Sequence, residues 1–470
     1  MKTINDYKEE IHKCSKCGLC QSVCPVYKVT GNDCSVSRGK FIMLGGIIKG
    51  DLELNKNVNK YLDMCLKCNA CKDFCPSDID ARKIFLTAKA EYFNKARNSK
   101  FIRILNSELV FNLFLNCARI TTNTYRFLRL DKLARIFYPI LSKFELGKKV
   151  ILANEFIKVK NNDNIFSLLP FPFSQKQQAT NSNKIVYFKG CVNECINPRT
   201  KIATENILKQ MGVNVINANF QCCGVPFLSG GNVEQFIKQA EFNLKQIPDD
   251  FANEFDFFLT DCASCQNAFK EYENYINDEK LLEKLKKINE KSINVVDFVV
   301  KNAKSFEFDF EAHSKQNLNR QSRLGFLPQQ HEANNVLNAP QSEKKPSFTF
   351  HKPCHLEDLS FLSEFLAKAK NVEYIEMKDF DKCCGFSGEF AIKNPEISQQ
   401  ISAEKAQNAL KTNADYILTS CPACLLGLLQ GGIEIWRYRG MKNSNSHTSI
   451  LPYIQPSHFI EFLAQSKITT

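Results

Sequence analysis

The chain has 470 residues, of which 44% are hydrophobic and 24% are charged. This composition excludes disordered and fibrous proteins, and the length leaves room for about three domains. The longest apolar runs fall well short of the roughly 18 residues that indicate a membrane-spanning helix. The formal net charge of +12 would suit a lipid surface or an acidic protein, but no basic run with interleaved aromatic residues favours nucleic acid.

The sequence contains 21 cysteines. Its first ten residues are polar, so we expect no signal peptide. In a reducing compartment, cysteines serve as metal ligands and not as halves of disulfides. We therefore expect a cytoplasmic protein without a transmembrane helix, with a peripheral position on the inner face of the cell membrane as the alternative.

Two runs of four cysteines near the amino terminus share the spacing C-x2-C-x2-C-x3-C-P. The first run is Cys14, Cys17, Cys20 and Cys24, and the second is Cys65, Cys68, Cys71 and Cys75. This spacing is typical of bacterial ferredoxins with two [4Fe–4S] clusters, in which the fourth cysteine of each run binds the cluster of the other run. Zinc is disfavoured, because it is usually bound by cysteine pairs with a longer gap between them.

The ferredoxin spacing thus predicts the ligands of two clusters. For cluster 1 they are Cys14, Cys17, Cys20 and Cys75. For cluster 2 they are Cys65, Cys68, Cys71 and Cys24. The two clusters should be close neighbours, because each run contributes to both of them.

The segment after the cysteine runs has a helical pattern. The exit helix is expected to begin at residues 77–80 and to continue over 81–96. Over 97–165, apolar residues recur near the helical period with basic residues between them, which suits a helix on a protein core better than one on a membrane. Residues 161–182, with Pro170 and Pro172, are a predicted linker.

The rest of the chain is predicted to hold two copies of one α/β unit, over 183–310 and 347–470. In the first copy, predicted strands at 184–189, 214–217 and 255–260 precede Cys191, the pair Cys222 and Cys223, and the pair Cys262 and Cys265. In the second copy, predicted strands at 347–351, 372–376 and 414–419 precede Cys354, the pair Cys383 and Cys384, and the pair Cys421 and Cys424. Residues 311–346, rich in Gln, Asn and Ser, are a predicted flexible linker.

Alternating strands and helices place ligands outside the carboxyl ends of the strands. Five thiols should therefore converge in each copy. Two adjacent cysteines do not chelate one metal ion comfortably, so we favour a cluster of several irons, although four thiolates would also satisfy a structural zinc in one copy. Cys195 could take the place of Cys191, while Gly224 and Gly385 allow a close approach of the backbone.

The cysteine pattern of these copies resembles the cysteine-rich CCG domain of heterodisulfide reductase, in which five cysteines bind a noncubane [4Fe–4S] cluster. With the ferredoxin runs, the whole order resembles two families, the iron–sulfur subunit of glycolate oxidase and the corresponding iron–sulfur subunit of anaerobic glycerol-3-phosphate dehydrogenase. The stretches that carry the resemblance are 190–193, 222–226, 353–355 and 383–385. It implies an α+β protein: a helical ferredoxin-like domain with two [4Fe–4S] clusters over 1–96, a helical connector, and two α/β CCG domains with one or two further clusters, noncubane in type.

The sequence shows no G-x-G-x-x-G between a strand and a helix, so we expect neither flavin nor NAD on this chain. The resemblance then implies an electron-transfer subunit of a flavin-dependent glycolate or lactate dehydrogenase, with an FAD-containing partner and a membrane quinone, menaquinone or ubiquinone, as acceptor. Alternatives are a glycerol-3-phosphate dehydrogenase subunit, a catalytic subunit that reduces a disulfide or quinone at the CCG sites, and a non-enzymatic sensor or scaffold. His351 and His355 flank Cys354 and could hydrogen-bond a cluster sulfur, although a place in the surroundings of the cluster or on the surface is favoured.

Overall fold

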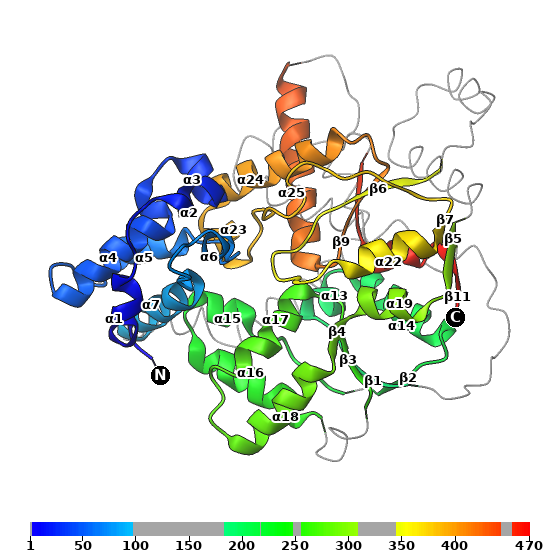
Figure 1. The fold of residues 1–470 in the computed structure, drawn as a ribbon, viewed down its shortest axis with the longest axis horizontal. Coiled ribbons are helices and arrows are strands. Elements are labelled where there is room, and N and C mark those ends of the chain that lie inside the picture. Colours follow the sequence, from blue (N-terminus) through cyan, green and yellow to red (C-terminus); the bar gives the residue numbers. More distant parts are fainter. Residues whose placement is uncertain (1, 97–182, 217, 248–254, 309–344, 443–453) are drawn as a thin grey trace, which may run out of the picture.

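The computed structural model describes residues 2–96, 183–216, 218–247, 255–308, 345–442 and 454–470. A helical amino-terminal unit lies beside two α/β units (Figure 1). The predicted connector over 97–182, and all but the last two residues of the predicted linker over 311–346, lie outside the described residues. Within the described residues, no helix combines the length and apolar character needed to cross a bilayer.

The amino-terminal unit is built from short helices around a small core. They are η1 (Ile4–Tyr7), α1 (Lys8–His12), α2 (Leu19–Val23), α3 (Pro25–Thr30), η2 (Asp33–Ser35), α4 (Ser37–Lys49), α5 (Lys56–Asp63), α6 (Ala70–Asp73) and α7 (Ala81–Ala96). Pro25 starts α3 directly after Cys24, where a missing backbone N–H costs nothing. Leu44, Leu62 and Ile84 from α4, α5 and α7 are buried together and hold the cysteine loops in place.

The first α/β unit contains a parallel sheet with the strand order β2-β1-β3-β4. Its elements are β1 (Lys184–Phe188), α13 (Cys191–Cys195), α14 (Pro198–Gln210), β2 (Asn214–Ile216), α15 (Val225–Gly230), α16 (Val233–Lys245), β3 (Phe257–Thr260), α17 (Ala263–Tyr272), α18 (Glu279–Glu290), β4 (Ser292–Asn294), α19 (Val295–Asn302) and β5 (Ser305–Phe308). The central strands β1 and β3 are largely buried, as is typical of parallel sheets with helices on both faces.

The second α/β unit repeats this design. Its elements are β6 (Ser347–Phe350), α22 (Ser360–Lys368), β7 (Ala369–Lys370), β8 (Glu373–Tyr374), α23 (Glu389–Lys393), α24 (Pro395–Leu410), β9 (Tyr416–Thr419), α25 (Pro422–Lys442), β10 (Gln455–His458), α26 (Phe459–Leu463) and β11 (Ser466–Thr469). Its strand order β8-β6-β9-β10 matches that of the first unit, and all of its neighbours are parallel. The predicted fold class, a helical domain followed by two repeated α/β units, is confirmed.

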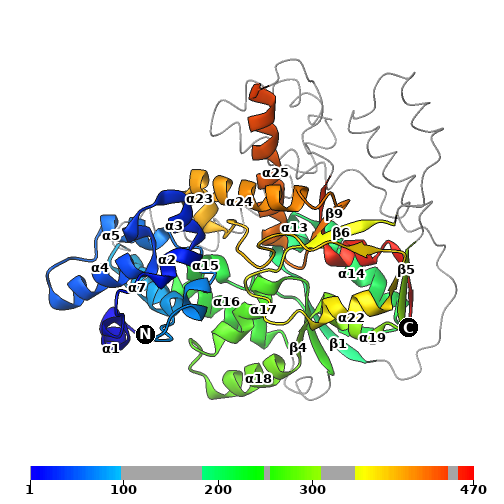
Figure 2. The ribbon, with the colours of Figure 1, turned by 45° about the horizontal axis from the view of Figure 1, so that its top comes forward.

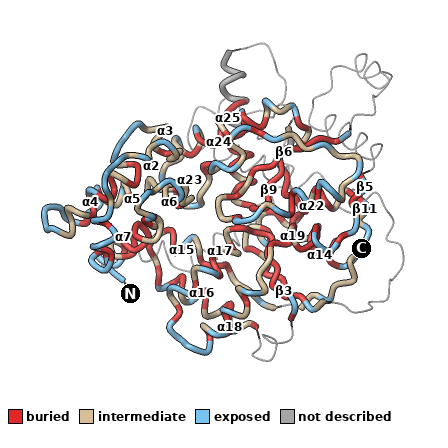
Figure 3. The backbone as a smooth tube through the Cα atoms, viewed as in Figure 1, coloured by how far each residue is buried: buried red, intermediate tan, exposed pale blue. Residues whose placement is uncertain are grey.

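The last elements of each α/β unit pack against the other unit, which the sequence analysis did not predict. Strand β5 of the first unit pairs antiparallel with β11 and parallel with β7 of the second (Figure 1). Helix α26 packs on α14 of the first unit, while α19 packs on α22 of the second. Phe308 and Phe462 stack across this contact with ring centroids 4.7 Å apart. The units therefore share one core, visible as the buried interior in Figure 3.

The helical unit also contacts the second α/β unit. Helix α24 packs on α3, and Figures 1 and 2 both show them side by side. A small apolar cluster seals this contact, with Val26 and Leu66 from the helical unit against Phe390 and Ile401. This packing brings the second cysteine run next to the cysteines of the second copy.

Candidate metal centres

One cavity, called cavity 1, lies between the two cysteine runs. About 440 Å³ of space free of protein atoms lies among lining residues that include Cys14, Cys17, Cys20 and Cys75. Lys16 and Gly18 wrap the first loop around it with left-handed backbone angles, φ 59° and 87°. The structure thus brings together the four thiols that the ferredoxin spacing grouped as cluster 1.

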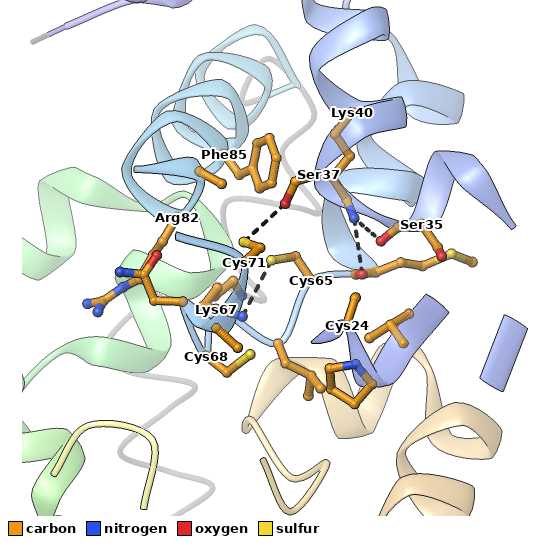
Figure 4. A pocket seen from close by; sticks show the side chains of 17 residues that line it. Cys24, Ser35, Ser37, Lys40, Cys65, Lys67, Cys68, Cys71, Arg82 and Phe85 are labelled. Carbon is orange, nitrogen blue, oxygen red and sulfur yellow. Dashed lines mark hydrogen bonds between the residues drawn. The ribbon is translucent and has the colours of Figure 1, made fainter. Parts of the chain in front are cut away.

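A second cavity of similar size, called cavity 2, is drawn in Figure 4. Its cysteines are Cys24, Cys65, Cys68 and Cys71, the set grouped as cluster 2. Lys67 and Asn69 turn the loop with φ of 60° and 62°. Ser37, Cys71 and Ala81 line both cavities, so cavities 1 and 2 are direct neighbours.

The thiols of cavity 2 suit a multi-iron cluster. Burial raises the pKa of Cys24 to about 11 and that of Cys71 to about 12. Such thiols ionise when a metal ion binds them, because the positive charge of the metal stabilises the buried thiolate that water cannot reach. Ser37 Oγ donates to Cys71 Sγ at 3.1 Å and the Lys67 N–H donates to Cys65 Sγ at 3.4 Å, which stabilises the thiolates. A set of four sulfur donors in a lined cavity fits an iron–sulfur cluster.

The five predicted cysteines of the first copy also come together. Cys191 Sγ lies 3.4 Å from Cys222 Sγ, and Cys265 Sγ lies 3.5 Å from Cys223 Sγ. Cys262, at the start of α17, is hydrogen-bonded to Cys265 in the first turn of that helix. Hydrogen bonds to Cys223 and Cys262, together with burial, raise the pKa of the Cys265 thiol well above its ordinary value, so it needs a metal ion to ionise. Cys191 is thus in contact with the adjacent cysteine pair.

The second copy shows the same convergence. A chain of hydrogen-bonded thiols runs through Cys354, Cys383, Cys384, Cys424 and Cys421. Gly385 follows the adjacent pair with φ 82°, and a Cβ there would come within 2.8 Å of Ile401. The pair can therefore approach α24 closely only because a glycine follows it.

Two histidines lie among these sites. His351 is fully buried, and one of its ring nitrogens lies with Cys384 Sγ and Cys424 Sγ in a group whose atoms are all within 4.8 Å of one another. His355 Nδ1 lies 3.2 Å from Ser264 Oγ, which belongs to the first copy. His351 thus lies in the interior, while His355 is half-buried beside the cysteines.

The four cysteine sites form a series in which neighbours are in contact. The thiol of Cys68 at cavity 2 is hydrogen-bonded to Cys383 of the second copy. Cys421 of the second copy is in turn hydrogen-bonded to Cys262 of the first. The order is cavity 1, cavity 2, the second cysteine-rich site and the first cysteine-rich site. Sequence reasoning missed this order, because no sequence pattern relates the cavities to either copy.

A buried ionic cluster, called the junction network, holds the three units together beside cavity 2. It consists of Asp63, Lys67, Lys89, Glu389 and Lys393. The Lys89 ammonium lies 2.6 Å from Asp63 and 2.9 Å from Glu389, and it donates to the backbone oxygen of Ser229 at 2.5 Å. Burial raises the pKa of Glu389, but the ammonium groups of Lys89, Lys67 and Lys393 outweigh burial and hold it at about 2. Sequence analysis missed this network.

Comparisons with known proteins agree with this geometry. A family model described as a 4Fe-4S dicluster domain matches residues 10–79, and one described as a cysteine-rich domain matches residues 185–270 and again 348–428. The chain belongs to the iron–sulfur proteins that join a dicluster domain to two cysteine-rich domains. The resemblance found in the sequence is thereby confirmed.

Named relatives of this iron–sulfur protein span most of its length. The probable glycolate oxidase iron-sulfur subunit of Bacillus subtilis is 24% identical over 92% of this chain and 92% of the relative. The glycolate oxidase iron-sulfur subunit of Escherichia coli is 22% identical over 90% of each. Lactate utilization protein A 1 of Bacillus cereus is 25% identical over 52% of this chain and 90% of its own length.

Proposed function

We propose that this protein is the iron–sulfur electron-transfer subunit of a flavin-dependent 2-hydroxy-acid dehydrogenase, and that it passes electrons from an FAD-containing partner towards membrane quinone. The names of the full-length relatives support glycolate as the substrate, and the shorter relative supports lactate. A glycerol-3-phosphate dehydrogenase subunit is the alternative within the same class.

The proposed ligands are the cysteines that the structure groups. Cavities 1 and 2 each take one [4Fe–4S] cluster, and each cysteine-rich site takes one further cluster of noncubane type on its five thiols. Iron–sulfur clusters supply one-electron transfer when bound. The fit is supported by donor sets made of sulfur and by buried thiols that need a metal ion to ionise.

The observation that carries this proposal is the unbroken series of four cysteine sites. Electron transfer weakens steeply with distance, so a relay requires redox sites with little protein between them. Cys68 touches Cys383, and Cys421 touches Cys262, so thiol contacts link three of the four sites. Cavities 1 and 2 share lining residues. A sensor or scaffold has no need for such an alignment.

The rim of cavity 1 is the surface proposed for the redox partner. Cys17 is the one exposed thiol among the cysteines that the structure describes. Leu19 and Phe74, which also line cavity 1, are 50% and 57% exposed. Large apolar side chains exposed beside a redox site favour the docking of a protein.

A second candidate, reduction of a disulfide or quinone at the cysteine-rich sites, is favoured by the polar bridge between them. Ser264 Oγ lies 3.6 Å from Cys421 Sγ and 3.2 Å from His355 Nδ1, so protonatable groups lie where the two sites meet. Protein that reduces a disulfide with electrons from a chemical donor, at a rate lost in Cys384→Ser, would favour this candidate over the relay.

The relay is tested with protein prepared without oxygen. We expect about four clusters' worth of iron per chain, and we expect reduction by the flavoprotein partner when glycolate or lactate is added. Cys68→Ser should remove the cavity 2 signal in electron paramagnetic resonance (EPR) spectra and stop electrons from reaching the cysteine-rich sites. Cys34→Ser is the matched control, since Cys34 is half-buried and lines neither cavity. Stoichiometric zinc with little iron would contradict the proposal.

A further inference from the structure

The two cysteine-rich sites differ at one buried position. In the first copy, β1 ends at Phe188, three residues before Cys191. In the second copy, the residue three positions before Cys354 is His351, directly after β6. Phe188 and His351 are both fully buried. The same place in the fold thus holds a hydrocarbon ring at one site and an imidazole at the other.

The hydrogen bond of His351 fixes which nitrogen carries its proton. His351 Nδ1 lies 3.2 Å from the backbone oxygen of Phe380. A carbonyl oxygen only accepts, so Nδ1 must be the N–H donor. In a neutral imidazole, Nε2 then carries a lone pair and no proton. A histidine that binds a metal ion commonly donates its other ring N–H to a backbone carbonyl in this way.

The remaining nitrogen has no partner within the described part of the protein. Nε2 of His351 is buried and makes no hydrogen bond to any described residue. Buried polar atoms without a partner are rare, and each one calls for an explanation. The neighbours of the ring are the Sγ atoms of Cys384 and Cys424, within 4.8 Å. Because Nδ1 is held by the Phe380 oxygen, Nε2 is the ring nitrogen of this group that can become a third metal ligand beside the two thiols.

We infer that His351 binds iron through Nε2 at the second cysteine-rich site in place of one of the five thiolates proposed above, while the first site uses thiolates alone. The inference rests on the proposed function, because it requires iron at this site. Replacement of anionic sulfur by neutral nitrogen raises the reduction potential of an iron–sulfur centre. The second site is then the more easily reduced of the two cysteine-rich sites.

The test uses the full-length protein with its iron, made with ¹⁵N-labelled histidine. The signal of the second site is assigned in EPR spectra by its loss in Cys424→Ser. Electron–nuclear double resonance on that signal should show a histidine ¹⁵N coupling, and this coupling should disappear in His351→Phe, which installs the residue of the first copy. His355→Val installs the first copy's Val192 at the neighbouring position and should keep the coupling.

The outcomes separate the inference from the proposed function. A second-site signal without histidine ¹⁵N coupling, or a coupling that persists in His351→Phe, overturns the inference and leaves the relay intact. Absence of iron from the second site in the unaltered protein overturns both. If His351→Phe does not fold, the labelled unaltered protein compared with His355→Val still decides whether a histidine other than His355 binds. The expected fall in midpoint potential in His351→Phe is a second readout, independent of activity.

Discussion

The two cysteine-rich copies have the same strand order and the same five cysteine positions, yet they occupy different places in the molecule. The second copy lies between cavity 2, through Cys383, and the first copy, through Cys421. The first copy has a direct thiol contact with the second site. Equivalent cysteines can therefore have unequal roles, because their place in the series differs. The second copy is a middle site and the first copy a terminal one because of their positions in the fold, since their cysteine patterns are the same.

The largest expected effect comes from breaking the middle site. Cys384→Ser should remove the second-site signal and also stop reduction of the first site by the flavoprotein partner, since electrons would have to cross the second site. The equivalent change in the first copy, Cys223→Ser, should remove the first-site signal and leave reduction of the second site intact. The measurement is rapid-freeze EPR spectroscopy after mixing with reduced partner.

A small reductant provides the control for this pair. Dithionite should reduce the first site in Cys384→Ser, because it does not depend on the series. Equal loss of both signals in the two variants, with partner as donor, would contradict the series order.

A smaller effect is expected from the junction network, which holds the second copy to the helical unit. The pKa of Glu389 falls from its ordinary 4.5 to about 2 and its side chain is 18% exposed, so ionised Glu389 contributes about 3 kcal/mol to stability. Glu389→Gln should lower the free energy of unfolding at pH 7 by about that amount, since it leaves buried lysines underpaired. Denaturant titration measures it, with exposed Glu396→Gln as the control.

The pH dependence of the Glu389 effect has a definite sign. The folded-state pKa is depressed, so the contribution is fully present above pH 4.5 and is lost as the pH falls from 4.5 towards 2. The difference in unfolding free energy between the wild type and Glu389→Gln should therefore be largest at neutral pH and should close in acid. A difference that stays constant across this range would show that Glu389 acts through packing.

The smallest expected effect concerns a hydrogen bond between the copies. Ser264 Oγ of the first copy lies 3.6 Å from Cys421 Sγ of the second. The equivalent residue in the second copy is Ala423, which has no hydroxyl group to make the same hydrogen bond to the first site. Loss of a hydrogen bond of about 1 kcal/mol to a ligand sulfur should lower the second-site midpoint potential by roughly 40 mV. Redox titration of Ser264→Ala measures it, and Ser363→Ala, at an exposed serine, should leave the potential unchanged.

The sequence predicted the members of each cysteine group because those groups follow from local rules. The spacing of the two runs encodes the exchange of Cys24 and Cys75, and strand ends encode the convergence within each copy. The contact of Cys68 with Cys383 could not be predicted, since it depends on α24 packing against α3 far along the chain. Spacing rules describe neighbours in sequence, and this contact is purely tertiary.

Two further features escaped prediction for physical reasons. Strands β5 and β11 have four residues each and no turn or cysteine to mark them, so their pairing between units left no pattern. Lys89 fits the helical pattern of α7 as an ordinary helix former, and its burial depends on Asp63 and Glu389 from other segments. A charged residue gives no local sign that its partners will enclose it.

The pairing of β5 with β11 has a consequence for how the protein is made. Their paired residues Phe308 and Ser466 are 158 positions apart, which a ribosome covers in roughly 8 to 30 s at 5–20 residues per second. During that time β5 has an unpaired edge and the first copy lacks the helix that covers α14. The two units therefore complete their shared sheet only at the end of synthesis, after residue 469 has emerged.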